Sequence, residues 1–254
     1  MKEITKRAER VMLLLSGGKG ERIGGNTPKQ YISVAGKMII ARCLERLLEY
    51  GRFDKLVVVA DGQWSDAIWK VVEGLFSKDE GLDNSAANGA FFPRFFGFAE
   101  PGKNRALSIY NGLRYVSTAV DEDAVIMIHD AVRPLVSDAQ LEACFAACRE
   151  HDGAMPVLPM KDTVYLSRDG VRVSELLPRD QVVAGQAPEA FVLGKYMAAY
   201  EALMPDKIFS VNGSTEPAIL AGMDVAMIPG DENNFKITTP QDLERYKEIC
   251  RHEV

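Results

Sequence analysis

Short apolar segments alternate with segments of helical periodicity along most of this chain, and this alternation constrains the fold more than any other feature. Residues 11–15, 56–60, 124–128 and 154–158 read as buried β-strands. Between the first two, apolar residues recur at helical spacing over residues 39–48. Regular alternation of this kind predicts an α/β fold with a doubly wound, mostly parallel sheet. Ligands of such sheets bind beyond the carboxyl ends of the strands.

Polar N-cap residues mark where several of the predicted helices begin. Gln140 lies three residues after Ser137, which is the spacing of a capping box. Pro240 occupies the first turn of the last helix, a position that needs no backbone N–H. Residues 91–98 are expected to form a core strand, and residues 77–90 a surface loop or insertion. We expect Ser65, Asn104, Ser137 and Thr239 to cap the helices that follow them.

Residues 161–186 interrupt the alternation. Apolar and polar residues alternate over 164–166 and 171–173, on either side of Arg168-Asp169-Gly170. A glycine-containing turn between two such segments predicts a β-hairpin. Because an isolated hairpin is only marginally stable in water, this arm, residues 161–186, must pack on something. Packing on its own domain and exchange with a second subunit are both open.

The composition is that of an ordinary globular protein. The 254 residues, 47% hydrophobic and 26% charged, suffice for one large α/β domain or two small ones. The formal net charge of −6 gives no general attraction to nucleic acid or membranes, so any anion site must be local. No apolar stretch is long enough to span a membrane, and residues 1–10 lack an apolar signal core. We expect a cytoplasmic protein without nucleic acid or membrane partners.

The four cysteines do not indicate disulfides or a zinc site. Cys43, Cys144, Cys148 and Cys250 lack the spacing of either, and Cys144 and Cys148 fall on the apolar face of a predicted helix. We therefore expect core thiols. The sequence contains three histidines, which argues against a histidine-rich metal site. A metal, where one is used, would be held by a carboxylate and by substrate phosphates, as Mg²⁺ usually is.

A glycine-rich segment follows the first predicted strand. Gly17, Gly18 and Gly20 allow the backbone to approach an anion closely and to turn its N–H groups toward it. Arg22 and Lys29 supply two cations for more than one phosphate. The spacing matches neither G-x-x-x-x-G-K-[ST] nor G-x-G-x-x-G. The glycines alone are also compatible with a purely structural turn, but the two cations favour nucleotide binding.

Four further segments place polar residues at predicted strand ends or helix starts. Residues 101–108 enter a predicted helix, and residues 128–134 end a predicted strand in Asp130 and Arg133. Residues 178–188 follow the predicted hairpin, and residues 234–240 place Lys236 before the last helix.

Together and in this order, the five segments resemble the cytidylyltransferases that join CTP to 2-C-methyl-D-erythritol 4-phosphate or D-ribitol 5-phosphate. The resemblance spans roughly residues 11–250. It implies a single Rossmann-like nucleotidyltransferase domain, residues 1–254, with Mg²⁺ as cofactor. It also implies a homodimer in which the protruding arm, residues 161–186, passes Thr163 and Arg179 into the neighbouring subunit's site. In the implied reaction, an acceptor phosphate oxygen attacks the α-phosphorus of CTP and pyrophosphate leaves, so positioning and cations do most of the catalysis.

The resemblance also implies roles for individual positions. Arg22 and Lys29 would hold the triphosphate and stabilise the charge that develops on it, and Lys236 would be the third catalytic residue. Asp130 is the candidate protein ligand for the metal, with the CTP phosphates as the alternative. His129 has no expected role as a base, because the attacking phosphate is already anionic. The nucleotide-binding residues would be Ser16, Gly17, Gly18, Gly102, Lys103 and Ser108, and the acceptor-binding residues Asp130, Arg133, Thr163 and Arg179.

Departures from the family pattern leave the acceptor open. Ala187 replaces a usual threonine near the acceptor, and Tyr165 stands where the methylerythritol enzymes often carry lysine. Some of the other segments favour the ribitol group and some favour the methylerythritol group. Between these acceptors we lean to D-ribitol 5-phosphate or another open-chain polyol phosphate. Two alternatives are a sugar-1-phosphate nucleotidylyltransferase, which uses a similar glycine loop, and a nucleotide-binding homologue that has lost catalysis.

Overall fold

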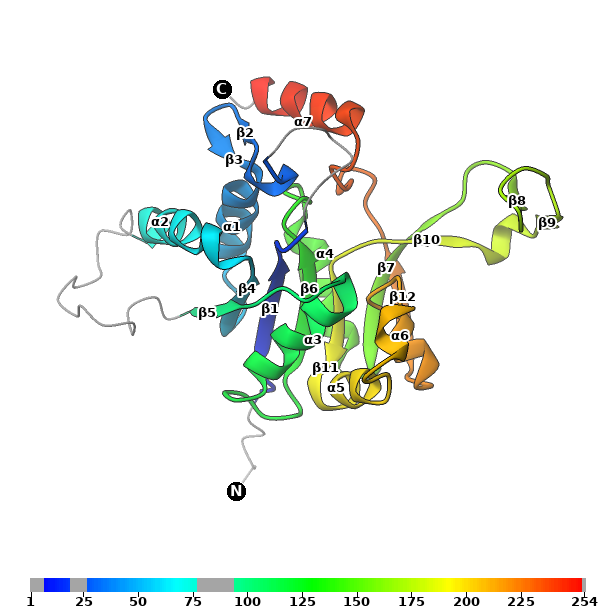
Figure 1. The fold of residues 1–254 in the computed structure, drawn as a ribbon, viewed down its shortest axis with the longest axis horizontal. Coiled ribbons are helices and arrows are strands. Elements are labelled where there is room, and N and C mark those ends of the chain that lie inside the picture. The colour runs from blue at the N-terminus through cyan, green and yellow to red at the C-terminus, as the bar shows by residue number, and fades with distance from the viewer. Residues whose placement is uncertain (1–6, 19–26, 77–93, 253–254) are drawn as a thin grey trace.

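A mixed eight-stranded sheet forms the centre of the molecule (Figure 1). The structure is a computed structural model, and it describes residues 7–18, 27–76 and 94–252. The strands of this sheet are β1 (Arg10–Leu15), β4 (Lys55–Val59), β5 (Phe95–Ala99), β6 (Val125–Asp130), β7 (Gly153–Pro159), β10 (Val183–Gly185), β11 (Glu189–Val192) and β12 (Val225–Pro229). Their order is β10-β7-β11-β6-β1-β4-β5, and β12 also pairs with β7.

Most of this sheet is parallel, as the alternation predicts. β1 pairs in parallel with β4 and β6, β4 with β5, and β12 with β7. β10 and β11 run antiparallel to β7, and β11 also runs antiparallel to β6. The doubly wound, mainly parallel sheet is therefore confirmed, with two antiparallel strands that the sequence pattern did not indicate.

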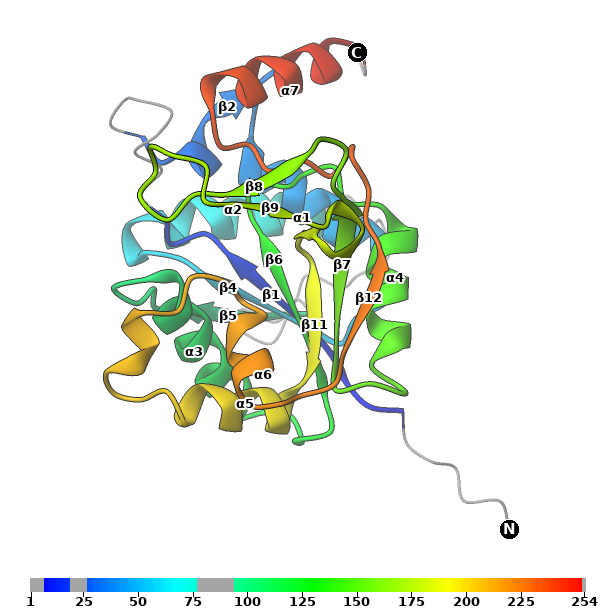
Figure 2. The ribbon, with the colours of Figure 1, turned by 90° about the vertical axis from the view of Figure 1, so that its right-hand side faces the viewer.

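Helices cover both faces of the sheet (Figures 1 and 2). The helices are α1 (Ile39–Tyr50), α2 (Ser65–Phe76), α3 (Arg105–Val116), α4 (Asp138–Ala147), α5 (Leu193–Glu201), α6 (Glu216–Leu220) and α7 (Pro240–His252). Met12 and Leu14 of β1 are buried with residues of α1, α2 and α4, whereas Leu13 is buried with residues of α3 and α5. Successive residues of β1 thus face opposite cores, as the two-residue period of a strand requires. A third apolar cluster, which includes Tyr246, attaches α7.

Three predicted N-caps are confirmed. The side chain of Asn104 accepts a hydrogen bond from a backbone N–H in the first turn of α3, and Ser137 does the same for α4. At the start of α7, the Thr239 hydroxyl accepts from the Asp242 N–H at 3.2 Å, and the Asp242 carboxylate accepts from the Thr239 N–H at 2.7 Å. These bonds satisfy N–H groups that have no partner within the helix.

Two details of the predicted helix starts are wrong. Ser65 is the first residue of α2 and not its cap; Asp61 caps the 3₁₀ turn η3 (Gly62–Trp64) that precedes the helix. Gln140 does not complete a capping box, because its Oε1 accepts a hydrogen bond from Asn234 Nδ2 at 2.8 Å. Both amides are buried, so a long-range partner replaces the local one.

Other predicted features have mixed outcomes. All four cysteines are free and buried, as expected. The predicted loop at residues 77–90 lies outside the described residues, as does the start of the strand predicted at 91–98, and β5 begins at Phe95. The sequence pattern missed α6, β12 and the small hairpin of β2 (Ser33–Val34) and β3 (Lys37–Met38).

The predicted arm is a hairpin that extends away from the body (Figure 1). Its strands are β8 (Val164–Leu166) and β9 (Glu175–Leu177), which pair with each other in a separate two-stranded sheet. Residues 171–173, predicted as the second strand, instead belong to the turn, where the Asp169 carboxylate accepts two backbone N–H groups. Tyr165 and Leu176 are 56% and 61% exposed, so these apolar side chains are not covered by the body of the same chain.

The carboxyl ends of the central parallel strands meet at one edge of the sheet. Leu15, the last residue of β1, pairs with Asp130 of β6 and with Val59 of β4, and Val59 pairs with Ala99 of β5. The loops that leave these strands therefore start side by side. Within the described residues, no helix has the length and apolar character needed to cross a bilayer.

Candidate functional site

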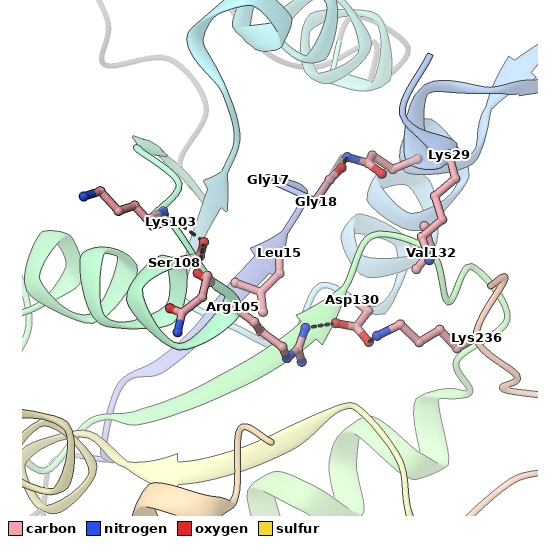
Figure 3. A pocket seen from close by; sticks show the side chains of 13 residues that line it. Leu15, Gly17, Gly18, Lys29, Lys103, Arg105, Ser108, Asp130, Val132 and Lys236 are labelled. Carbon is pink, nitrogen blue, oxygen red and sulfur yellow. Dashed lines mark hydrogen bonds and ion pairs between the residues drawn. The ribbon is translucent and has the colours of Figure 1, made fainter. Parts of the chain in front are cut away.

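A cavity of about 630 Å³ opens at this edge of the sheet (Figure 3). Its lining comes from segments that are far apart in the sequence but follow neighbouring strands. The lining residues are Leu15, Gly17, Gly18, Lys29, Gln30, Gly102, Lys103, Asn104, Arg105, Ser108, Asp130, Val132 and Lys236. A cavity at the carboxyl ends of parallel strands is where the fold places ligands.

The glycine-rich segment passes very close to the turn that follows β5. A Cβ atom on Gly17 would lie 2.5 Å from the Cβ of Pro101, well inside van der Waals contact. A Cβ atom on Gly102 would lie 2.2 Å from the Cβ of Leu107. Gly17 is therefore required for close packing of its loop on Pro101, and Gly102 for close packing of its turn on the first turn of α3. Both contacts are with protein atoms, so the approach to an anion expected from the sequence stays a prediction.

The first turn of α3 forms one wall of the cavity. Ser108 Oγ donates to the Asn104 carbonyl at 2.9 Å and accepts from the Gly102 N–H at 3.0 Å. Ser108 thus holds the loop onto the helix. In Figure 3, the side chain of Lys103 extends away from the cavity end that contains Asp130.

The same cavity is bordered by a carboxylate that three cations share. Asp130, the last residue of β6, pairs with Arg105 through Oδ1, and its Oδ2 lies 2.9 Å from Lys236 Nζ and 3.7 Å from Arg133 Nε. Burial alone would raise the pKa of Asp130, but the charges of Arg105, Lys236 and Arg133 outweigh it and hold the pKa well below its usual range. Asp130 is therefore ionised at neutral pH, and the cluster around it carries excess positive charge.

A buried polar layer supports this cluster from behind. Arg105 Nη2 donates to Ser214 Oγ at 3.3 Å, Ser214 Oγ donates to the Glu189 carboxylate, and Thr215 Oγ1 donates to Glu189 Oε1 at 3.1 Å. Burial raises the pKa of Glu189, while the hydroxyl donors and Arg105 oppose that effect. Sequence reasoning gave no role to Arg105, Glu189, Ser214 or Thr215. The sequence does show Arg105 as a cation in the first turn of a predicted helix, and this position could have indicated a site residue. Glu189, Ser214 and Thr215 belong to no sequence motif that could have indicated them.

His129 has the character of a structural residue. It is fully buried, and its Nε2 donates to the Arg133 carbonyl at 3.0 Å. Burial lowers its pKa to about 4, so the imidazole is neutral at physiological pH. These features support the expectation that His129 does not act as a base.

The structure gathers most of the predicted site residues and separates a few. Ser16 and Arg133 are not among the lining residues, but Ser16 precedes Gly17 and bonds Tyr31, and Arg133 contacts Asp130. Thr163 and Arg179 lie on the arm and line a different hollow of about 410 Å³ with Leu176, Leu177 and Pro178. Arg22 lies outside the described residues. The predicted residues that line the cavity are Gly17, Gly18, Lys29, Gly102, Lys103, Ser108, Asp130 and Lys236.

The described lining does not supply a protein-held magnesium site. Asp130 is the carboxylate of this lining, and Arg105 and Lys236 each engage one of its oxygens. Among the described residues, no cluster of three His, Cys, Asp or Glu side chains could ligate a metal. Asp130 would have to give up an ion pair to bind Mg²⁺, so these residues do not fit a resident metal.

The known proteins to which this chain is similar include cytidylyltransferases. The family model of 2-C-methyl-D-erythritol 4-phosphate cytidylyltransferase (IspD) matches residues 11–252. The enzyme of that name from Geobacter metallireducens is 32% identical over 91% of this chain and 93% of its own length. The ribitol-5-phosphate cytidylyltransferase of Lactiplantibacillus plantarum is 28% identical over 91% and 93%.

Two further comparisons concern length and fold. The bifunctional enzyme IspD/IspF of Maricaulis maris is 33% identical over 92% of this chain, which spans 55% of that longer protein. The crystal structure of 4-diphosphocytidyl-2C-methyl-D-erythritol synthase from Anaerococcus prevotii superposes with a TM-score of 0.75 over 96% of this chain and 99% of its own, at 22% identity, which shows a shared fold. The family match over nearly the whole sequence, together with relatives above 30% identity, makes this chain a member of the 2-C-methyl-D-erythritol 4-phosphate cytidylyltransferase family.

Proposed function

We propose that this cytidylyltransferase transfers CMP from CTP to an open-chain alditol phosphate, and that D-ribitol 5-phosphate is a better acceptor than 2-C-methyl-D-erythritol 4-phosphate. The observation that carries the proposal is one cavity lined by two chemically different groups of residues (Figure 3). Gly17, Gly18 and Lys29 form one group, which we call the donor end, and the Asp130–Lys236 pair belongs to the other, which we call the acceptor end. Such an arrangement suits two phosphorylated substrates that must meet in line.

The donor end fits a triphosphate. Lys29 contributes a point charge to the same cavity as Gly17 and Gly18, whose backbone can approach an anion closely. We assign Lys29 and Arg22 to the phosphates of CTP, where negative charge accumulates as pyrophosphate leaves. The attacking group is an acceptor phosphate oxygen that is already anionic, so the reaction needs no general base, and the buried, neutral His129 supplies none.

The acceptor end fits a second, anionic substrate. Arg105, Arg133 and Lys236 outnumber Asp130, and the surplus positive charge attracts the acceptor phosphate. Because Asp130 holds Lys236 at 2.9 Å, the ammonium group is oriented before substrate arrives. We assign Lys236 to the acceptor phosphate. We assign Asp130 to the polyol hydroxyls, because an ionised carboxylate is a strong acceptor of hydrogen bonds from hydroxyl groups.

We also propose a homodimer in which the arm contacts a second copy. The arm exposes the apolar side chains of Tyr165 and Leu176, which the body of the same chain does not cover. It also carries the hollow lined by Thr163 and the cationic Arg179. Exposed apolar surface of this kind favours association. In the dimer, Thr163 and Arg179 would complete the acceptor end of the partner's cavity.

The remaining assignments follow from the substrates. We propose that Mg²⁺ enters on the phosphates of CTP, since the described lining offers it no site. CTP and alditol phosphates are metabolites of the cytoplasm, and we propose that residues 1–254, arm included, act there as one nucleotidyltransferase domain.

The deciding experiment measures pyrophosphate release with each nucleoside triphosphate against D-ribitol 5-phosphate, 2-C-methyl-D-erythritol 4-phosphate and a hexose 1-phosphate. We expect turnover with CTP and an alditol phosphate, and a higher kcat/KM for D-ribitol 5-phosphate. Faster turnover of the hexose 1-phosphate would establish a sugar-1-phosphate nucleotidylyltransferase instead. Binding of CTP without pyrophosphate release from any pair would establish a non-catalytic homologue.

A further inference from the structure

Gln30, which lines the cavity, makes two contacts with the glycine-rich segment. Its Nε2 donates to the Ser16 carbonyl at 2.6 Å and to the Gly18 carbonyl at 2.8 Å, and the residue is only 3% exposed. Both amide hydrogens are therefore used on backbone oxygens of the glycine-rich segment. Two carbonyl acceptors also define which end of the side-chain amide is the NH₂ group.

These contacts determine where the N–H of Gly17 points. In a trans peptide the carbonyl and the following N–H point in opposite directions within one plane. A Ser16 carbonyl held by Gln30 therefore directs the Gly17 N–H away from Gln30. The Ser16 N–H is already bonded to the Val59 carbonyl at 2.8 Å, whereas no described group accepts from the Gly17 N–H.

The same contacts remove an electrostatic obstacle. Carbonyl oxygens of Ser16 and Gly18 that faced the cavity without a donor would repel the phosphates of a nucleotide. The Gln30 amide neutralises both by hydrogen bonding.

Gln30 also couples the glycine-rich segment to Lys29. Lys29, Gln30 and Tyr31 form a single 3₁₀ turn, η2 (Lys29–Tyr31). Tyr31 anchors this turn, because its hydroxyl accepts from Ser16 Oγ at 2.8 Å and its ring stacks on Trp64 with centroids 3.8 Å apart. The cation and the loop backbone are thereby held in one rigid arrangement.

We propose that Gln30 is a positioning residue for the donor half of the site, which aims the Gly17 N–H at the phosphates of CTP and sets the loop relative to Lys29. This inference rests on the proposed function and names a residue that acts through the backbone. Gln30 itself makes no contact with the reacting atoms in this scheme.

Two substitutions test the role. Gln30→Met removes both donors at similar volume, and Gln30→Glu places a carboxylate against two carbonyls. We expect kcat/KM for CTP to fall on the order of 10²-fold in both, because a shift of about 1 Å in a positioned group costs that much. The KM for the alditol phosphate should stay unchanged, and calorimetry should show weaker binding of both CTP and inorganic pyrophosphate. Gln63→Glu, at an exposed position, is the matched control for the added charge and should leave every value unchanged.

The possible outcomes separate this inference from the proposed function. An active wild type whose Gln30→Met variant keeps wild-type kcat/KM and wild-type calorimetric affinity for CTP would overturn the positioning role alone. A variant that loses activity only in proportion to its loss of folded protein would overturn it as well. A wild type that transfers CMP to no alditol phosphate would overturn the proposed function, and the calorimetric affinities for CTP and pyrophosphate would still decide the role of Gln30.

Discussion

Replacing Asp130 by asparagine removes the anion that three cations share, while the shape of the side chain is preserved. Asp130 is 6% exposed as a side chain, and Arg105, Lys236 and Arg133 are 31%, 35% and 11% exposed. Breaking a buried ion pair by removal of one partner costs about 3–5 kcal/mol, because the remaining charge is left buried without compensation. Arg105 and Lys236 keep partial access to water, so we expect the lower end, about 3 kcal/mol.

This loss in the free energy of unfolding is measured by urea unfolding, with circular dichroism as the signal. At about 2–4 °C per kcal/mol for a chain of this length, the same loss lowers Tm by roughly 6–12 °C. Asp138→Asn is the matched control, because Asp138 also pairs with an arginine, Arg46, but its side chain is 52% exposed. The control should lose less than about 1 kcal/mol.

The dependence on pH provides a second check. The folded-state pKa of Asp130 lies below its unfolded value, so its contribution to stability is present above the unfolded pKa of about 4 and is lost as the pH falls through the folded pKa. The difference in unfolding free energy between wild type and Asp130→Asn should therefore be constant from pH 5 to 8 and shrink below about pH 4. A difference under about 1 kcal/mol at pH 7, or one that grows toward acid, would refute the ion-cluster argument.

Three further predictions concern the loops and the arm. Lys29→Ala should lower kcat by about 10²–10³-fold with an unchanged circular dichroism spectrum, because a preorganised charge at the leaving group is lost; near-normal turnover would remove Lys29 from catalysis. Gly17→Ala should cost about 1–3 kcal/mol and weaken CTP binding in calorimetry, because its Cβ would meet Pro101 at 2.5 Å; Gly62→Ala, where a Cβ meets no atom within 4 Å, is the control. Leu176→Asp on the arm should convert a dimer to a monomer in analytical ultracentrifugation, and a wild-type monomer at high concentration would contradict the dimer itself.

The fold was predictable from the sequence where the pattern is local. The four predicted strands match β1, β4, β6 and β7 to within two residues at each end, and Asn104, Ser137 and Thr239 cap their helices as predicted. The failures are positions where another hydrogen-bond partner, distant or nearby in sequence, competes with the predicted pattern. Gln140 bonds Asn234 instead of closing a capping box, and residues 171–173 wrap around Asp169 instead of forming a strand.

The site divides in the same way. Gly17 and Lys29 were identified from the glycine-rich segment, and Asp130 and Lys236 from the resemblance to the family; all four line one cavity. Gln30 directly follows Lys29, yet nothing in the sequence indicates that its amide turns back onto Ser16 and Gly18. Such a contact depends on where the backbone returns.

The amino-acid sequence by itself determined the alternation of strands and helices, the position of the glycine-rich segment and the family, because apolar periodicity, glycine spacing and segment order are properties of the chain. Only the tertiary structure decided which cation faces which anion. It brings Arg105 from α3 and Lys236 from the loop before α7 onto Asp130, and sets Glu189, Ser214 and Thr215 behind them. A buried polar group takes whichever partner the packing brings within reach, and that partner is set by three-dimensional proximity rather than by separation along the chain.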